Sequence, residues 1–226
     1  VPDGYSVFII DEPVKREVFA ASFKDRIVHH LVVNAIDPFI EKRLIYDCYA
    51  NRKGKGTHFG IERLRHFMAS STDNWKKEAW CLKLDIKGFF MFIDKIILWR
   101  KLKDYLLAVY HYGNLPIMMN LLETILFTDP TQGCQFCSPA SKWQNLDPSK
   151  SLFTAGKGLG LPIGNLTSQI MANFYLSFLD HYVKHDLGIE MYGRYVDDFF
   201  LIHEDKEYLK RCLYGIERFL HDELHL

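Results

Sequence analysis

The chain has 226 residues, of which 48% are hydrophobic and 15% aromatic, and its 28 basic and 28 acidic side chains give a formal charge of zero. This composition supports a packed globule and excludes both a disordered chain and a protein that binds nucleic acid through net charge alone. No apolar run approaches the roughly 18 residues of a membrane span, so no membrane partner is expected.

The N-terminal forty residues are predicted to form a hairpin followed by a helix. Residues 5–10 predict a strand, residues 11–13 a turn and residues 15–20 the returning strand. A helical pattern then runs from Asp25 and is predicted to stop at Pro38, because proline interrupts helical hydrogen bonding. The first strand begins so close to residue 1 that we expect the chain to be cut from a longer protein.

Positive charge is concentrated between residues 51 and 66, where five basic residues face a single acid, Glu62. Glycines predict a flexible loop over residues 51–58, without the spacing of a phosphate-binding P-loop, and a helix follows over 61–68. We expect this loop to contact a nucleic-acid backbone; a plain surface loop is the alternative. The basic residues are Arg52, Lys53, Lys55, Arg63 and Arg65.

Three aspartates stand where two predicted strand elements end. Residues 80–85 alternate between apolar and polar side chains and predict a half-buried strand that ends at Asp85. Residues 195–196 and 199–202 predict two short strands joined by a turn that carries Asp197 and Asp198. Such carboxylates can bind two Mg²⁺ ions about 3.5 to 4 Å apart. Zinc is not favoured, because neither segment has a histidine and no cysteine lies next to the acids. An ordinary acidic surface turn is the alternative.

The stretch from residue 113 to residue 150 is the hardest to interpret. It predicts a short apolar helix over 117–127 and then a loop with several prolines, which we interpret as an insertion that contacts RNA or a protein partner. Cys134 and Cys137 have zinc-site spacing but lack a second pair. Five scattered cysteines favour a reduced intracellular compartment. Residues 156–169 are glycine-rich and lead into a predicted helix that ends near Gly188.

Three of these segments together resemble the palm motifs of reverse transcriptases. Residues 84–90 (LDIKGFF) resemble motif A, residues 160–169 (GLPIGNLTSQ) motif B and residues 195–198 (YVDD) motif C, in the expected order and spacing. Further similarity at residues 15–17, 23–30, 50–58 and 150–153 extends the resemblance over most of the chain. Motif B is most similar to that of diversity-generating retroelements, whose reverse transcriptases are related to group II intron and retron enzymes.

The resemblance implies a role for each group of residues. Asp85, Asp197 and Asp198 would be catalytic and would bind two Mg²⁺ ions, or Mn²⁺, with Ile86 as a further metal ligand. The incoming nucleotide would contact Arg16, Lys15, Arg26, Phe90, Ile163, Gly164 and Gln169. The nucleic acid would contact Arg52, Lys53, Lys55, Arg63 and Tyr195. The alternatives are a solvated edge strand for Arg16 and an ordinary core ring for Phe90.

Within this set, Arg16 is the first choice for the triphosphate, because its guanidinium matches phosphate oxygens in pairs. Phe90 would lie under the sugar and exclude a 2′-hydroxyl, which favours deoxynucleotides. Ile163 stands where the commoner motif has glutamine, so checking of the base pair would depend on shape alone, and the resemblance links this change to errors at template adenines.

We therefore predict an α+β fold: a right hand reduced to fingers (residues 1–78) and palm (residues 79–226), with an antiparallel palm sheet backed by helices. The thumb is expected to be missing. The predicted function is RNA-directed DNA polymerisation, with an RNA template, a DNA or RNA primer, deoxynucleotides and an accessory protein of the retroelement as partners. The location implied is the cytoplasm of a bacterium, with a bacterial or phage gene.

Four other functions remain open at this point. A retron enzyme and a group II intron enzyme are the nearest alternatives within reverse transcriptases. A nucleotidyl cyclase-like palm enzyme would place paired acids on a similar sheet but would have no template for motif B to contact. A non-catalytic role in RNA binding or as a protein scaffold is the last.

Overall fold

The computed structural model describes residues 2–226 and contains two compact units, each built from two separate stretches of chain. The first unit comprises the chain up to Ile40 together with Lys87–Ala172, and the second comprises Glu41–Ile86 together with Asn173–Leu226. These units follow other limits than the expected fingers and palm, whose division between residues 78 and 79 stays a prediction. The limits differ because the helix following the basic loop packs on strands β5 and β6 of the second unit.

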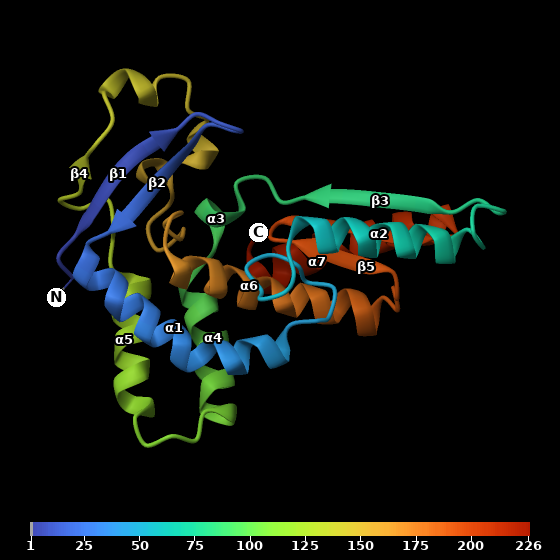
Figure 1. Cartoon of the computed structure of the whole chain (residues 1–226), viewed down its shortest axis with the longest axis horizontal. Coiled ribbons are helices and arrows are strands. Elements are labelled where there is room, and N and C mark those ends of the chain that lie inside the picture. The colour runs from blue at the N-terminus through green and yellow to red at the C-terminus, as the bar shows by residue number, and fades with distance from the viewer. Residues whose placement is uncertain (1) are drawn as a thin grey trace. The chain divides into compact units, whose positions relative to one another are not determined.

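The first unit contains the N-terminal hairpin. Strands β1 (Tyr5–Ile10) and β2 (Arg16–Ala21) pair antiparallel with Tyr5 opposite Ala21, which confirms the predicted hairpin. A short strand from the predicted insertion, β4 (Gln135–Phe136), pairs parallel with the other edge of β1 (Figure 1). The insertion therefore supplies a third strand to this sheet.

Helices and short turns complete the first unit. Helix α1 continues through Pro38, contrary to the predicted stop, because its apolar face is buried on both sides of the proline, at Ile36 before it and at Ile40 after it. Asp94 caps the next long helix, and its Oδ1 accepts from the backbone N–H groups of Ile96 at 2.8 Å and Ile97 at 3.1 Å. The elements are α1 (Phe23–Arg43), α3 (Phe89–Phe92), α4 (Lys95–Val109), α5 (Leu115–Phe127), η1 (Ala140–Trp143), η2 (Pro148–Lys150) and η3 (Leu152–Thr154).

The second unit contains an antiparallel sheet in the order β3-β6-β5, as predicted for a palm. Its strands are β3 (Trp80–Asp85), β5 (Tyr192–Tyr195) and β6 (Asp198–His203). Its helical elements are α2 (Thr57–Ser71), the part of α6 (Leu166–His181) from Asn173 on, the π turn η4 (Tyr182–Asp186) and α7 (Lys206–Leu224). Across residues 2–226, none of the helices combines the length and the apolar character needed to cross a membrane.

A buried glutamate anchors the predicted insertion to the hairpin. Glu17 on β2 is fully buried, and its carboxylate accepts from the indole N–H of Trp143 at 3.0 Å, from the Ser151 hydroxyl at 3.0 Å and from the Leu152 backbone N–H at 2.9 Å. Removing any of these donors would leave a buried charge less well satisfied. The segment after α5 is therefore fixed to β2 through a specific polar contact.

The motif B segment is hydrogen-bonded to the free edge of β2. The backbone N–H of Phe19 donates to the carbonyl of Ile163 at 2.8 Å, and the Asn165 amide donates to the Phe19 carbonyl at 2.9 Å and accepts from the Ala21 N–H at 3.3 Å. Gly164 lies between these contacts with a φ of +115°, and a Cβ there would stand 2.7 Å from Val18 Cγ1. Glycine is required at this position because of β2 as well as for any nucleotide contact.

Substitution of Gly164 by alanine is expected to destabilise the protein by about 1 to 3 kcal/mol, because the added methyl group overpacks against β2 at an unfavourable backbone angle. Urea unfolding measures the difference. Gly113→Ala is the matched control, since a Cβ there meets no atom within 4 Å and the φ is ordinary; it should change stability by less than about 0.5 kcal/mol. Equal effects of the two substitutions would contradict the prediction.

Candidate active site

The palm sheet brings Asp85 and Asp198 together. They are direct partners in the antiparallel register between β3 and β6, so their side chains leave the same face of the sheet with Cβ atoms about 4.5 to 5.5 Å apart. Asp197 precedes Asp198 in the two-residue turn between β5 and β6. The predicted hairpin is therefore present, but its turn is Val196-Asp197 and not Asp197-Asp198, because Asp198 already pairs with Tyr195 and Asp85 as the first residue of β6. The three aspartates still lie at one end of one sheet.

The turn that carries Asp197 has an uncommon backbone. Val196 has a φ of +59°, a conformation that a β-branched residue rarely adopts, and Asp197 does not share it. A positive φ at only the first central residue is typical of a type II′ turn, which joins twisted strands well. The carbonyl oxygen of Val196 accepts a hydrogen bond of 2.8 Å from Nη1 of Arg194.

The three carboxylates interact electrostatically. Burial, together with the negative charges of Asp85 and Asp198, raises the pKa of Asp197 to about 6 from its ordinary value of 3.8. Asp198 has a cationic neighbour, since Nζ of Lys83 lies 3.3 Å from its Oδ1, but both side chains are largely exposed and the pair contributes little. Crowded acids of this kind favour the binding of a divalent cation.

The donor set fits magnesium in its chemistry. The acids offer only oxygen ligands, and they lie at an end of the sheet that is partly open to solvent, which suits a hard cation. Within residues 2–226, however, no three His, Cys, Asp or Glu side chains lie close enough together to hold a metal ion. The acids therefore have the right chemical identity and lie at one end of one sheet, but their side chains would have to draw closer to bind a metal ion. Ile86 follows directly after β3, and its role as a ligand stays a prediction.

The residues predicted to bind the triphosphate belong to the first unit. Arg16 lies exposed at the start of β2, and its Nε makes a 3.4 Å contact with the Val14 carbonyl. Lys15 donates from Nζ to the Gln144 carbonyl at 2.8 Å, which ties it to the insertion. Arg26 is on α1, where its guanidinium lies 5.9 Å from the ring of Phe23.

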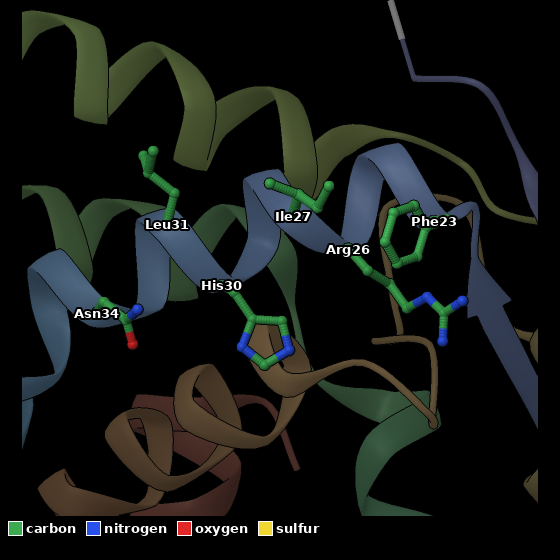
Figure 2. Close-up of a pocket in the computed structure, with 6 residues that line it drawn as sticks. All are labelled: Phe23, Arg26, Ile27, His30, Leu31 and Asn34. Carbon is green, nitrogen blue, oxygen red and sulfur yellow. The ribbon is translucent and has the colours of Figure 1, made fainter.

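Figure 2 shows Arg26 beside a surface pocket of about 650 Å³ along α1. Its lining residues come from one helix: Phe23, Arg26, Ile27, His30, Leu31 and Asn34. The structure thus keeps Arg26 accessible to a ligand, while its assignment to the nucleotide remains a prediction.

The residues predicted to shape the nucleotide pocket are partly buried. Phe90 and Ile163 both pack against a core cluster of the first unit that contains Phe19, Met91 and Leu152. The remaining buried members of that cluster are Tyr5, Val7 and Ala21. Gly164 is exposed and Gln169 is half-buried near the start of α6. The ring of Phe90 packs on the core but is only partly buried, which agrees both with a contact to the nucleotide sugar and with an ordinary core ring.

Several basic side chains of the loop and of helix α2 make their contacts within the protein. Arg52 donates to both oxygens of Glu41 at 2.9 Å and to the Cys48 carbonyl at 2.9 Å. Lys55 lies 4.2 Å from the ring of Tyr46. Arg63 pairs with Asp47 through bonds of 2.6 and 3.1 Å.

Lys53 and Tyr195 are exposed and remain the more accessible of the predicted nucleic-acid contacts. Lys53 lies in the basic loop, and Tyr195 ends β5 directly opposite Asp198. Arg52, in contrast, has a side chain only 7% exposed, so the structure gives it an internal role.

Sequence reasoning missed the polar residues that hold these motifs in place. Glu17 and Asn165 organise the first unit, and a fully buried ion pair between Asp180 and Arg194 organises the second. Arg194 shares one face of β5 with the buried aromatic Tyr192, and this spacing of two residues is the local signal that could have indicated its burial. No local signal identifies Asp180 as its partner.

Comparisons with known proteins agree with this geometry. A family model described as "Reverse transcriptase (RNA-dependent DNA polymerase)" matches residues 15–224. A search of curated protein sequences found no match.

Three telomerase structures are similar in fold. For apo telomerase from Candida tropicalis truncated from the C-terminal domain, the TM-score is 0.61 at 14% identity, over 97% of this chain and 47% of that one. Candida tropicalis telomerase with a TWJ fragment of telomeric RNA gives a TM-score of 0.62 at 12% identity, over 99% of this chain and 40% of that one. Candida albicans telomerase with a TWJ fragment of telomeric RNA gives a TM-score of 0.55 at 11% identity, over 99% of this chain and 41% of that one.

At such identities the similarity shows the fold alone, and this chain spans less than half the length of each telomerase chain. The family model covers nearly the whole chain, including the three aspartates on the palm sheet. The chain therefore belongs to the reverse transcriptase family.

Proposed function

We propose that this chain forms the fingers and palm of an RNA-directed DNA polymerase that extends a primer with deoxynucleotides. The observation that carries the proposal is the pairing of Asp85 with Asp198 in the sheet register, with Asp197 in the adjoining turn. This arrangement leaves three carboxylates at one end of the sheet, where two divalent cations would have oxygen ligands.

The chain's own residues would divide the chemistry as follows. Asp85 and Asp197 would hold both cations and Asp198 would be the more peripheral ligand. When bound, the cations would activate the primer 3′-hydroxyl and neutralise charge on the triphosphate. Arg16 would bind the triphosphate and stabilise the negative charge that develops at the α-phosphate. Phe90 would exclude a 2′-hydroxyl from the sugar site.

The finer assignment is to the diversity-generating retroelements, and it rests on motif B. Ile163 offers only an apolar surface where the commoner motif has glutamine, so selection of the base pair would lose a hydrogen-bonding group. Ser168-Gln169 departs from the commoner Ser-Pro in the same direction. An error-prone enzyme of a bacterium or phage, acting in the cytoplasm with an RNA template and an accessory protein, fits these features.

Primer extension by the complete gene product tests the proposal. A defined RNA template, a DNA primer, deoxynucleotides and Mg²⁺ or Mn²⁺ should give cDNA with the wild type. Asp85→Asn should reduce the rate by about a thousandfold or more, because a metal ligand that supplies several kcal/mol is lost. Asp104→Asn, at an exposed carboxylate on α4, is the control and should retain the wild-type rate.

Each alternative predicts a different product. Cyclic nucleotide formed without a primer would favour a cyclase, and stoichiometric RNA binding without extension would favour a scaffold. Sequencing of the cDNA tests the finer assignment, since an error-prone enzyme should misincorporate at template adenines. Faithful copying at adenines would exclude it while leaving polymerase activity intact.

A further inference from the structure

Arg194 is the largest fully buried side chain of the described structure, and it lies on β5, beside the turn that carries Asp197. A buried guanidinium is costly unless its charge and its N–H groups all have partners. Asp180 on α6 accepts from Nε and Nη2 of Arg194, each at 2.7 Å. Although burial opposes ionisation, the carboxylate of Asp180 raises the pKa of Arg194 above its ordinary value, so the side chain stays charged.

The remaining nitrogen of Arg194 reaches the turn. Nη1 donates to the Val196 carbonyl at 2.8 Å and to Oδ1 of Asn173 at 3.2 Å. The same guanidinium therefore joins helix α6 to the backbone that precedes Asp197. Tyr192 adds a hydrogen bond of 2.7 Å from its hydroxyl to Asp180 and so fixes the orientation of that carboxylate.

The backbone of Arg194 is held as well. Its N–H donates to the Asp47 carbonyl at 2.9 Å, and its own carbonyl accepts from the Tyr49 N–H at 2.9 Å. Since both backbone groups and all three nitrogens have partners, Arg194 has little freedom to move. It is a rigid point next to a turn whose conformation needs support.

That need comes from Val196, whose φ of +59° is unfavourable for a β-branched side chain. Such a conformation costs of order 1 to 3 kcal/mol and persists only where surrounding contacts hold it. The hydrogen bond from Arg194 to the Val196 carbonyl is a contact of this kind, because a peptide flip at Val196 would break it.

We propose that Arg194, oriented by Asp180, is a positioning residue that holds the strained Val196 turn and thereby presents Asp197 to a divalent cation. The inference rests on the proposed metal-dependent function and deepens it. Arg194 touches neither substrate nor metal; it acts through the backbone of the turn. A residue that only fills the core would stabilise the fold without influencing metal binding.

Mn²⁺ binding provides a readout besides activity, measured through the paramagnetic resonance signal of the free ion. Arg194→Lys keeps a positive charge near Asp180 but cannot bond Asp180 and the Val196 carbonyl together. It should weaken Mn²⁺ binding about 10- to 100-fold, as loss of an outer contact to a metal site does. Arg43→Lys is the matched control, because Arg43 also contacts α6, through a 2.8 Å bond to the Ser177 hydroxyl, and lies outside strand β5.

Rescue by glycine separates positioning from a structural role. Glycine adopts a positive φ without strain, so Val196→Gly in the Arg194→Lys background should recover most of the lost Mn²⁺ affinity. Primer extension should follow the same order. Val196→Gly does not restore the packing that Arg194→Lys removes from the core. If Arg194 had only a structural role, the double variant should therefore show no recovery of Mn²⁺ affinity. Asp180→Asn, which keeps the shape of the side chain, is the second variant if Arg194→Lys fails to fold.

A measurement on the wild type needs no substitution. Backbone amides of residues 196–198 should exchange with solvent at least about tenfold more slowly than those of Asp11 and Glu12, which are exposed in the turn between β1 and β2. Equal exchange would overturn the inference, as would wild-type Mn²⁺ affinity in Arg194→Lys or a lack of recovery with glycine. Absence of Mn²⁺ binding in the wild type would overturn the proposed function and the inference together.

Discussion

Asp197→Asn is expected to abolish primer extension and, at the same time, to make the metal-free protein more stable. Loss of a shared metal ligand should lower the rate by about a thousandfold or more. The gain in stability arises because burial and the charges of Asp85 and Asp198 disfavour the ionised Asp197, as its raised pKa of about 6 indicates. Asparagine has the same shape and carries no charge.

The sign of the pH dependence follows from that pKa. Because the folded protein holds the Asp197 proton up to about pH 6 and the unfolded chain releases it near 3.8, wild-type stability falls as pH rises through this interval. The advantage of Asp197→Asn should therefore be about 1 to 3 kcal/mol above pH 6 and should shrink as the pH falls towards 4.

Urea unfolding in the presence of a chelator, at pH 7.5 and at pH 4.5, measures both parts of this prediction. Asp104→Asn serves again as the control and should show neither effect. A variant that is less stable than the wild type at pH 7.5, or that retains more than a tenth of the rate, would show that the three acids do not form a repulsive metal site.

Asp180→Ala is expected to have the largest effect on stability, a loss of about 3 to 5 kcal/mol, because it leaves the fully buried guanidinium of Arg194 without its counter-charge. The exposed pair between Arg218 and Asp222 offers a comparison, and Asp222→Ala should leave the free energy of unfolding close to that of the wild type. Urea denaturation of the three proteins gives the numbers.

A double substitution sharpens this prediction. Arg194→Met with Asp180→Leu leaves no unpaired charge, so it should be more stable than Asp180→Ala alone. It also removes the donor to the Val196 carbonyl and should therefore bind Mn²⁺ weakly even though it is folded. Similar losses in Asp180→Ala and Asp222→Ala would contradict the assignment of a tightly coupled buried pair.

Local patterns were sufficient to predict the elements that carry the acids. Alternation along residues 80–85 and the aromatic and β-branched residues around Asp197 define short strands whose partners are close in sequence or strongly specified by their apolar faces. The antiparallel palm sheet and its acidic end could therefore be predicted. The metal site itself could not be resolved further, because side-chain distances depend on the turn at Val196 and on Arg194.

The misses have a common physical cause, which is that tertiary contacts decide them. Pro38 stops a helix only where no packing continues beyond it, and Ile40 supplies such packing. The strand β4 is only two residues long and has no pattern of its own. Arg52 has the charge of a phosphate ligand, but its partner Glu41 is visible only in the folded chain.

Both outer edges of the β1–β2 hairpin are hydrogen-bonded to other segments of the chain. β4 pairs with β1 on one side, and the segment from Ile163 to Asn165 is hydrogen-bonded to β2 on the other. The hairpin cannot swing on its own without breaking main-chain hydrogen bonds to motif B. If Arg16 moved on binding a triphosphate, Ile163 would therefore move as well. Binding of the nucleotide's phosphates at Arg16 and selection of its base at Ile163 would then be coupled through the hairpin.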